Sequence, residues 1–163
     1  EIKKKSISKL KLCWIGDANN NMMNSLIEAC IKFSVSLNIA CPKDYQPNKA
    51  LISLIKKQKG KIKIFNKKEK AVKNSDVVMT DKIISLNDKV NKKKKLKSFK
   101  NFKVDTKTMN LAKKDAIFLH CLPRASEVTE EVFLGKQSRV WQQALNRVYV
   151  QKSILLYCFG KLR

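Results

Sequence analysis

The sequence lacks several features that mark common functional classes. It has a single histidine, His120, and no C-x-x-C pair, so the chain offers too few ligands for a metal site. The G-x-G-x-x-G fingerprint of dinucleotide-binding domains is absent. No uninterrupted apolar run reaches the roughly 18 residues of a membrane span. Residues 1–12 are basic but lack the apolar core and cleavage site of a signal peptide. We therefore expect no metal and no membrane association.

The cysteines argue against a disulfide framework. There are five of them, an odd number, and they lie inside apolar segments such as LKLCWIG and FLHCLP. This usage is typical of reduced thiols in a cytoplasmic protein. The 163 residues, 44% of them apolar, suit one domain spanning residues 1–163. No internal repeat or Gly/Ser linker divides it, and because Glu1 is not Met we expect it to be part of a longer protein.

Positive charge dominates, with 36 Lys and Arg against 13 Asp and Glu, giving a formal net charge of +23. Only four of the basic residues are Arg, the better residue for forked contacts with phosphates and bases. The densest lysine block, residues 91–97, has no interleaved aromatic residue on which bases could stack. We expect a solvated, lysine-rich surface rather than a nucleic-acid partner, with a polyanion partner as the alternative.

Short apolar segments alternate with helical patterns along the first half of the chain. Strands are predicted at residues 9–16, 36–41, 61–65, 76–80 and 116–121. Helices are predicted at residues 21–33, 48–58, 67–74, 106–113, 130–134 and 139–159, with a lysine-laden helix between residues 81 and 105. This order predicts an α/β fold: a doubly wound, three-layer, Rossmann-like parallel sheet with helices on both faces and a long C-terminal helix.

Polar clusters follow three of the predicted strands, where such sheets bind ligands. Residues 16–20 either only cap the next helix or also contact a ligand. In the loop at residues 81–85, Asp81 could hold an ammonium group and Ser85 a carboxylate, or both could serve as caps. Arg147, in the last helix, is either solvated or a fourth member of this group.

The sharpest motif is HCLPR, residues 120–124. His120 and Cys121 are adjacent on a strand, so their side chains point to opposite faces and form a poor nucleophile pair. A strained turn that presents backbone carbonyls to a ligand fits better, and a buried strand end is the alternative. Pro123 makes a cis bond after Leu122 possible, and we predict one there.

These motifs together resemble the ornithine carbamoyltransferase family. The resemblance rests on WIGD-x-NN (residues 14–20), D-x-x-x-S (81–85), HCLPR, S-x-V-x-x-x-A-x-NR (138–147), CPKDYQP (41–47) and EVTEEVFL (127–134). It covers residues 10–159 and only the carboxyl-terminal, ornithine-binding half of that family; the S-x-R-T-R motif of the amino-terminal, carbamoyl-phosphate half is absent.

The resemblance implies transfer of a carbamoyl group from carbamoyl phosphate to the δ-amine of L-ornithine, giving citrulline and phosphate. It implies no cofactor, a homotrimer as the full-length protein and a partner domain at the amino-terminal side. Ornithine would be bound by Asn20, Asp81, Ser85 and the backbone of Leu86. Catalysis is assigned to Cys121, Asp81 and Arg147, and carbamoyl phosphate to Cys121, Leu122 and Arg147, with His120 and Pro123 in support.

One loop departs from the family pattern, because D-x-W-x-S-M-G reads DKIISLN at residues 81–87. An acylated ornithine is therefore an alternative substrate, and a non-catalytic basic module on the same fold is a further alternative. We also expect the chain alone to be inactive. The apolar stripe of the last helix, Val140, Ala144, Val148, Leu155 and Phe159, should be exposed toward Phe159, where it would meet the missing half.

Overall fold

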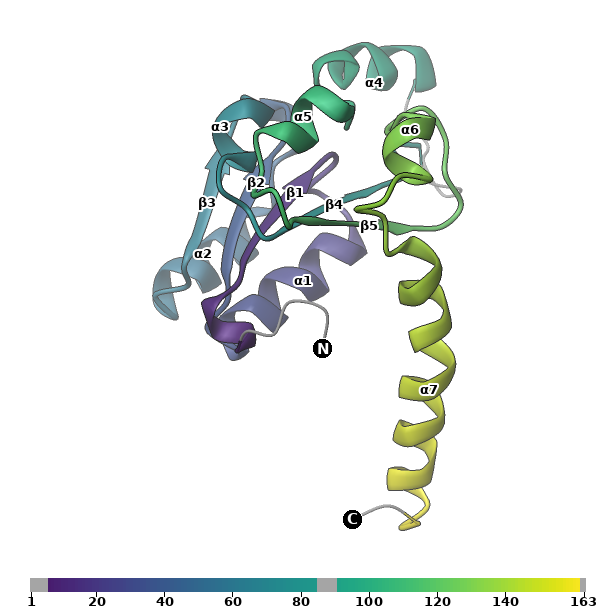
Figure 1. The fold of residues 1–163 in the computed structure, drawn as a ribbon. Coiled ribbons are helices and arrows are strands. Elements are labelled where there is room, and N and C mark those ends of the chain that lie inside the picture. The colour runs from purple at the N-terminus through teal and green to yellow at the C-terminus, as the bar shows by residue number, and fades with distance from the viewer. Residues whose placement is uncertain (1–5, 85–90, 162–163) are drawn as a thin grey trace.

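A parallel sheet forms the centre of the computed structural model, which describes residues 6–84 and 91–161 (Figure 1). Within these residues the sheet has five strands in the order β3-β2-β1-β4-β5. The pairings β1–β2, β1–β4, β2–β3 and β4–β5 are all parallel. The strands are β1 (Lys11–Ile15), β2 (Ser36–Ala40), β3 (Ile62–Phe65), β4 (Val77–Asp81) and β5 (Ile117–Cys121). The predicted α/β fold is confirmed.

Helices connect the strands and close the chain. They are α1 (Asn21–Lys32), α2 (Lys49–Lys57), α3 (Lys68–Val72), α4 (Lys92–Ser98), α5 (Thr106–Asn110), α6 (Glu130–Phe133) and α7 (Val140–Cys158). Side-chain caps explain where several of them begin. Asn20, Asn48, Asn91 and Asp105 each accept a hydrogen bond from the backbone N–H three residues on. No helix in the described part of the chain is long and apolar enough to cross a membrane.

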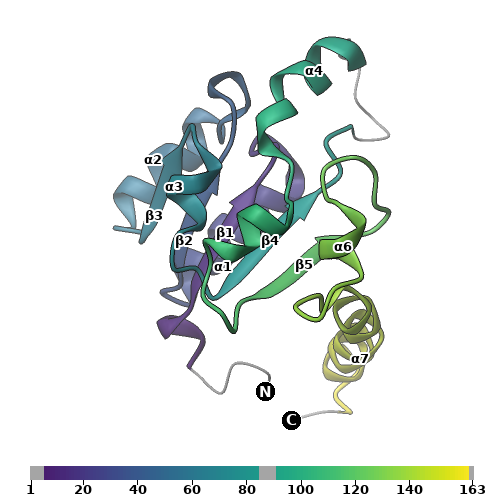
Figure 2. The same cartoon turned by 45° about the horizontal axis from the view of Figure 1, so that its top comes forward.

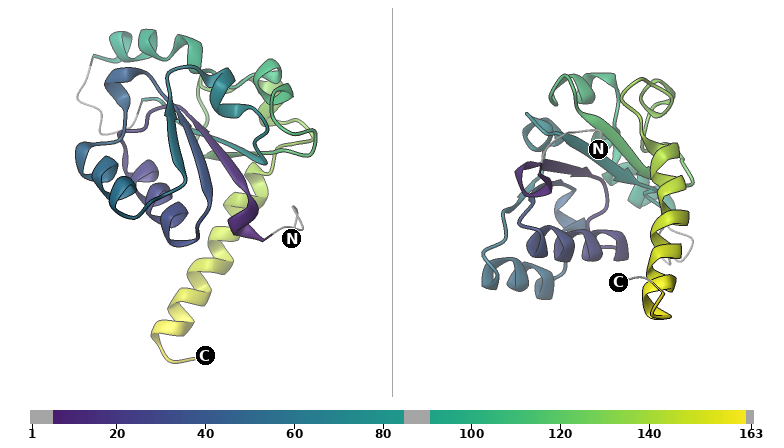
Figure 3. Two further views of the ribbon diagram at one scale, coloured as in Figure 1. Left: turned by 90° about the vertical axis from the view of Figure 1, so that its left-hand side faces the viewer. Right: turned by 60° about the horizontal axis from the view of Figure 1, so that its bottom comes forward.

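The helices lie on both faces of the sheet, as Figures 2 and 3 show. On one face α1 and α2 cover Trp14, Leu37 and Ile39 in one buried cluster. On the other face a second cluster joins the inward residues of β1, β4 and β5 to α3, α5, α6 and the first turn of α7. The sheet is therefore the middle of three layers.

Helix α7 leaves the body of the molecule after its first turn (Figure 1). Val140 is fully buried, whereas Ile154, Leu155 and Phe159 are 55%, 58% and 75% exposed. The predicted exposure of the apolar stripe toward Phe159 is thus confirmed. The helix carries apolar side chains that residues 6–84 and 91–161 leave exposed.

Candidate functional site

The strand order reverses at the carboxyl end of β1, and we use the word crevice for this edge of the sheet, between the loops that follow β1 and β4. The chain leaves β1 toward β2 on one side, while β4 and β5 lie on the other side of β1. Loops after β1 and β4 therefore diverge to opposite faces, and parallel α/β sheets bind ligands at such a point. The predicted site residues Asn20, Asp81 and Cys121 follow or end β1, β4 and β5, so the structure brings all three to this edge.

The turn after β1 is held by specific backbone geometry. Gly16 has φ +148°, a conformation that side chains rarely adopt, and a Cβ there would lie 3.4 Å from Thr80 Oγ1. The indole Nε1 of Trp14 donates to the carbonyl of Asp17 over 3.1 Å. Asn20 accepts from the Met23 N–H at 2.8 Å and donates through Nδ2 to the same Asp17 carbonyl. Asn20 is therefore a helix cap, and it also stands at the crevice with part of its amide unused.

A buried ion pair fastens α4 over this turn. Lys95 Nζ lies 2.6 Å from Asp17 Oδ2, and their side chains are only 4% and 8% exposed. The ammonium group also lies 5.5 Å from the ring centroid of Tyr45. The prediction of a uniformly solvated lysine block was wrong at Lys95, because a single turn of α4 faces the crevice and its lysine finds a carboxylate there.

Asp81 and Cys121 are direct neighbours on the paired strands β4 and β5. Both are half-buried, and Asp81 Oδ1 accepts a hydrogen bond from the N–H of Lys82 at 2.7 Å. Burial raises the pKa of Asp81, and the Lys82 hydrogen bond only partly offsets it. Burial destabilises the ionised form of this carboxyl group, so a cationic ligand bound beside it would stabilise the carboxylate.

Burial also raises the pKa of the Cys121 thiol to about 11; the Asp81 carboxylate adds to this effect and Arg147 opposes it. Cys121 is thus a neutral thiol near pH 7, which fits a polar contact better than a nucleophile. Arg147, which opposes the shift, is an exposed residue of α7. The membership of Arg147 in the site stays a prediction.

His120 points away from the crevice into a buried pair with Glu127. Its Nε2 lies 2.9 Å from Glu127 Oε1, and both side chains are almost fully buried. The Glu127 oxygen also accepts from the N–H of Ala125 at 2.6 Å. Burial by itself would raise the pKa of Glu127, but these hydrogen bonds hold it below its usual value. The pair ties the loop after β5 to the strand.

Other side chains complete the support of β5. Gln143 of α7 accepts a hydrogen bond from the His120 N–H at 3.0 Å. The Leu122–Pro123 bond is cis, which confirms the prediction for this turn. Leu122 is 43% exposed beside the crevice. Sequence reasoning did not single out Glu127, Gln143 or Lys95.

The remaining predicted residues, Ser85 and Leu86, lie outside the described residues, and so does Asn87. Among the residues that the structure describes, no group of three or more His, Cys, Asp or Glu could hold a metal ion. This edge of the sheet thus offers a carboxylate, an amide and a neutral thiol, and the resemblance adds the guanidinium group of Arg147 from α7. Such a set can bind an amino acid and stabilise negative charge on a carbonyl oxygen.

Sequence comparison relates the chain to one family. Residues 8–158 match the family model described as aspartate/ornithine carbamoyltransferase, Asp/Orn binding domain. Ornithine carbamoyltransferase of Methanocorpusculum labreanum is 41% identical over 149 residues, which cover 90% of this chain and 48% of that protein. The enzyme of Methanococcus maripaludis is 42% identical over 163 residues, covering 95% and 53%. The chain spans about half the length of the curated relatives it matches.

Solved structures give the same result. The ornithine carbamoyltransferase of Pyrococcus furiosus superposes with a TM-score of 0.86 at 33% identity, covering 99% of this chain and 53% of that one. The anabolic enzyme of Campylobacter jejuni gives a TM-score of 0.85 at 37% identity, covering 93% and 52%.

Proposed function

Because the chain belongs to the aspartate/ornithine carbamoyltransferase family through its Asp/Orn-binding domain, we propose that it forms the ornithine half of a carbamoyltransferase site. The reaction transfers the carbamoyl group of carbamoyl phosphate to the δ-amine of L-ornithine and gives citrulline and phosphate. One observation carries the proposal: Asp81 and Cys121 stand side by side on β4 and β5, next to the point where the strand order reverses.

The proposed ornithine contacts follow from the polar groups at this edge. The Asp81 carboxylate binds the α-ammonium group, which offsets the cost of its own burial. Asn20 contributes the part of its amide that the helix cap leaves unused. Ser85 and the backbone of Leu86 bind the α-carboxylate.

The chemistry requires a neutral δ-amine, because an ammonium nitrogen has no lone pair with which to attack. A free alkyl amine has a pKa near 10.4, so the site must favour the deprotonated form. The carbonyl oxygens of Cys121 and Leu122 accept hydrogen bonds from the reacting nitrogens. Arg147 faces the carbonyl oxygen of carbamoyl phosphate, where negative charge develops in the transition state. His120 and Pro123 hold this strand end in place.

The other half of the site comes from an amino-terminal domain of the same enzyme. That domain carries most of the phosphate-binding groups, and the exposed part of α7 faces it. The complete protein is a homotrimer that works in the cytoplasm in arginine biosynthesis. Positioning two substrates supplies most of the acceleration, so neither a metal nor an organic cofactor takes part.

The test is an assay of citrulline formation by a two-domain protein, in which the amino-terminal half of the Pyrococcus furiosus enzyme precedes this chain. We expect turnover with carbamoyl phosphate and L-ornithine and none with aspartate. Preference for N-acetylornithine would assign the site to an acylated substrate instead. A folded trimer that is inactive with every amine would support the non-catalytic alternative and overturn the proposal.

A further inference from the structure

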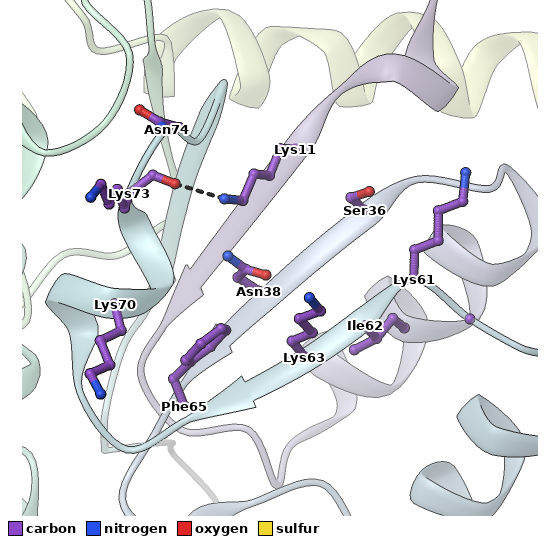
Figure 4. A pocket seen from close by; sticks show the side chains of 11 residues that line it. Lys11, Ser36, Asn38, Lys61, Ile62, Lys63, Phe65, Lys70, Lys73 and Asn74 are labelled. Atoms are coloured by element: carbon purple, nitrogen blue, oxygen red, sulfur yellow. Dashed lines mark hydrogen bonds between the residues drawn. The ribbon is translucent and has the colours of Figure 1, made fainter.

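A cleft opens near the amino ends of β1, β2 and β3, at the end of the sheet opposite the candidate site. It has a volume of about 570 Å³, within the roughly 300–1,000 Å³ usual for small-molecule sites. Figure 4 shows its lining. No acidic residue is among the described residues that line it. Five lysines line it: Lys11, Lys61, Lys63, Lys70 and Lys73.

Strand alternation explains why the cleft is polar. Side chains on one face of the sheet recur at every second residue, and toward the carboxyl ends these positions are Cys13, Ile15 and Ala40, buried in the core with α3. Toward the amino ends the same positions are occupied by Lys11 and Ser36. The five-residue helix α3 ends before it can cover them. A sheet face that is normally apolar and covered is here charged and open.

Two of the lysines, Lys11 and Lys63, flank a fixed amide (Figure 4). Asn38 is 7% exposed, and its Nδ2 donates to the carbonyl of Ala71 at 2.7 Å. Lys63 is its direct neighbour on β3, and Figure 4 shows Lys11 on its other side. Lys11 Nζ donates to the carbonyl of Lys73 at 2.7 Å, which leaves two of its three N–H groups for a ligand.

Like charges gathered in a cleft repel one another and focus a positive potential that attracts anions. A single monovalent anion cannot balance five ammonium groups, whereas a chain of phosphates can contact several at once. We propose that this cleft binds a linear di- or triphosphate group. The half-buried ring of Phe65 lies beside the lysines and offers a flat apolar surface to a ligand that also carries a base.

The probes are inorganic tripolyphosphate and ATP, titrated into the chain by calorimetry at about 0.15 M salt, where weak surface attraction is screened. Lys61→Gln with Lys63→Gln should weaken tripolyphosphate binding about tenfold, because two charge-assisted contacts are lost. The matched control is Lys56→Gln with Lys57→Gln, which removes the same charge from exposed positions of α2. It should change the affinity less than twofold.

The two probes distinguish the sources of the phosphate chain. If ATP binds more tightly than tripolyphosphate and the Phe65→Leu substitution removes this difference, the cleft is assigned to a nucleotide. If the two probes bind equally, it is assigned to the phosphates alone. The proposal would be overturned if the two double substitutions weakened tripolyphosphate binding equally, or if tripolyphosphate did not bind at this salt concentration. Asp81→Asn should leave the affinity unchanged, because the proposal does not depend on the ornithine site.

Discussion

At the residue scale, the buried pair of His120 and Glu127 makes stability depend on pH. The pKa of Glu127 is lowered from 4.5, so its contribution is present above about pH 4.5 and is lost as pH falls through the folded-state pKa. At pH 7 we expect Glu127→Gln to reduce the free energy of unfolding by about 1.5–3 kcal/mol, the range for a buried hydrogen bond to a charged group. Urea titrations should show this difference shrinking below pH 4.5.

The control for this experiment is Glu69→Gln on α3, whose exposed side chain should give the same small difference at every pH. A Glu127→Gln effect that stays constant down to pH 3 would mean that packing, and not the carboxylate, supports the pair.

The dependence of stability on pH that Asp81 contributes has the opposite sign to that of Glu127. Burial raises its pKa from 3.8, so ionisation costs the folded state stability as pH rises above that value. At pH 7 the midpoint temperature of thermal unfolding of the Asp81→Asn variant should therefore equal or exceed that of the unchanged chain. This advantage should disappear below pH 3.8 in thermal scans. A clear loss of stability at pH 7 would give Asp81 a structural role in place of a binding one.

Individual site residues were predictable to different degrees. Asn20, Asp81 and Cys121 could be placed together because parallel strands end at one edge, and each closes or follows a strand. Lys95 could not be told from its neighbours in a run of lysines, since its burial depends on which turn of α4 faces the crevice. Glu127 could not be identified from the sequence either, because its partner His120 lies on another element.

At the element scale, α7 divides into a packed start and an unpartnered remainder. Ile154→Gln with Leu155→Gln should change the free energy of unfolding by less than about 0.5 kcal/mol, as exposed positions do. Phe118→Ala in β5, fully buried, should cost about 3–5 kcal/mol. Denaturant titrations of both variants measure this contrast. A loss above about 2 kcal/mol for the α7 pair would mean that the helix packs on this chain's own core.

The elements themselves followed from the sequence. The predicted strands and the predicted starts of α1, α2 and α5 lie within a residue or two of those in the structure. The direction in which α7 leaves the sheet did not follow from periodicity alone, because a helix with an apolar stripe can fold onto its own domain equally well.

At the scale of the whole molecule, the chain has its own buried core on both faces of the sheet and, in the proposed function, one side of a reaction site. The proposed function needs the amino-terminal half to hold phosphate, so purified chain with both substrates should form no citrulline. Turnover above background that Cys121→Ala abolishes would contradict this division of labour.

The most direct test of the ornithine site is the KM for L-ornithine in the two-domain protein, measured for Asp81→Asn and for the exposed control Asp44→Asn. Loss of a charged hydrogen bond worth about 1.5–3 kcal/mol corresponds to a rise of about 10- to 100-fold. We predict this rise for Asp81→Asn with little change in the KM for carbamoyl phosphate, and no change for Asp44→Asn. An unaltered KM for ornithine in Asp81→Asn would contradict the assignment of this edge of the sheet to ornithine.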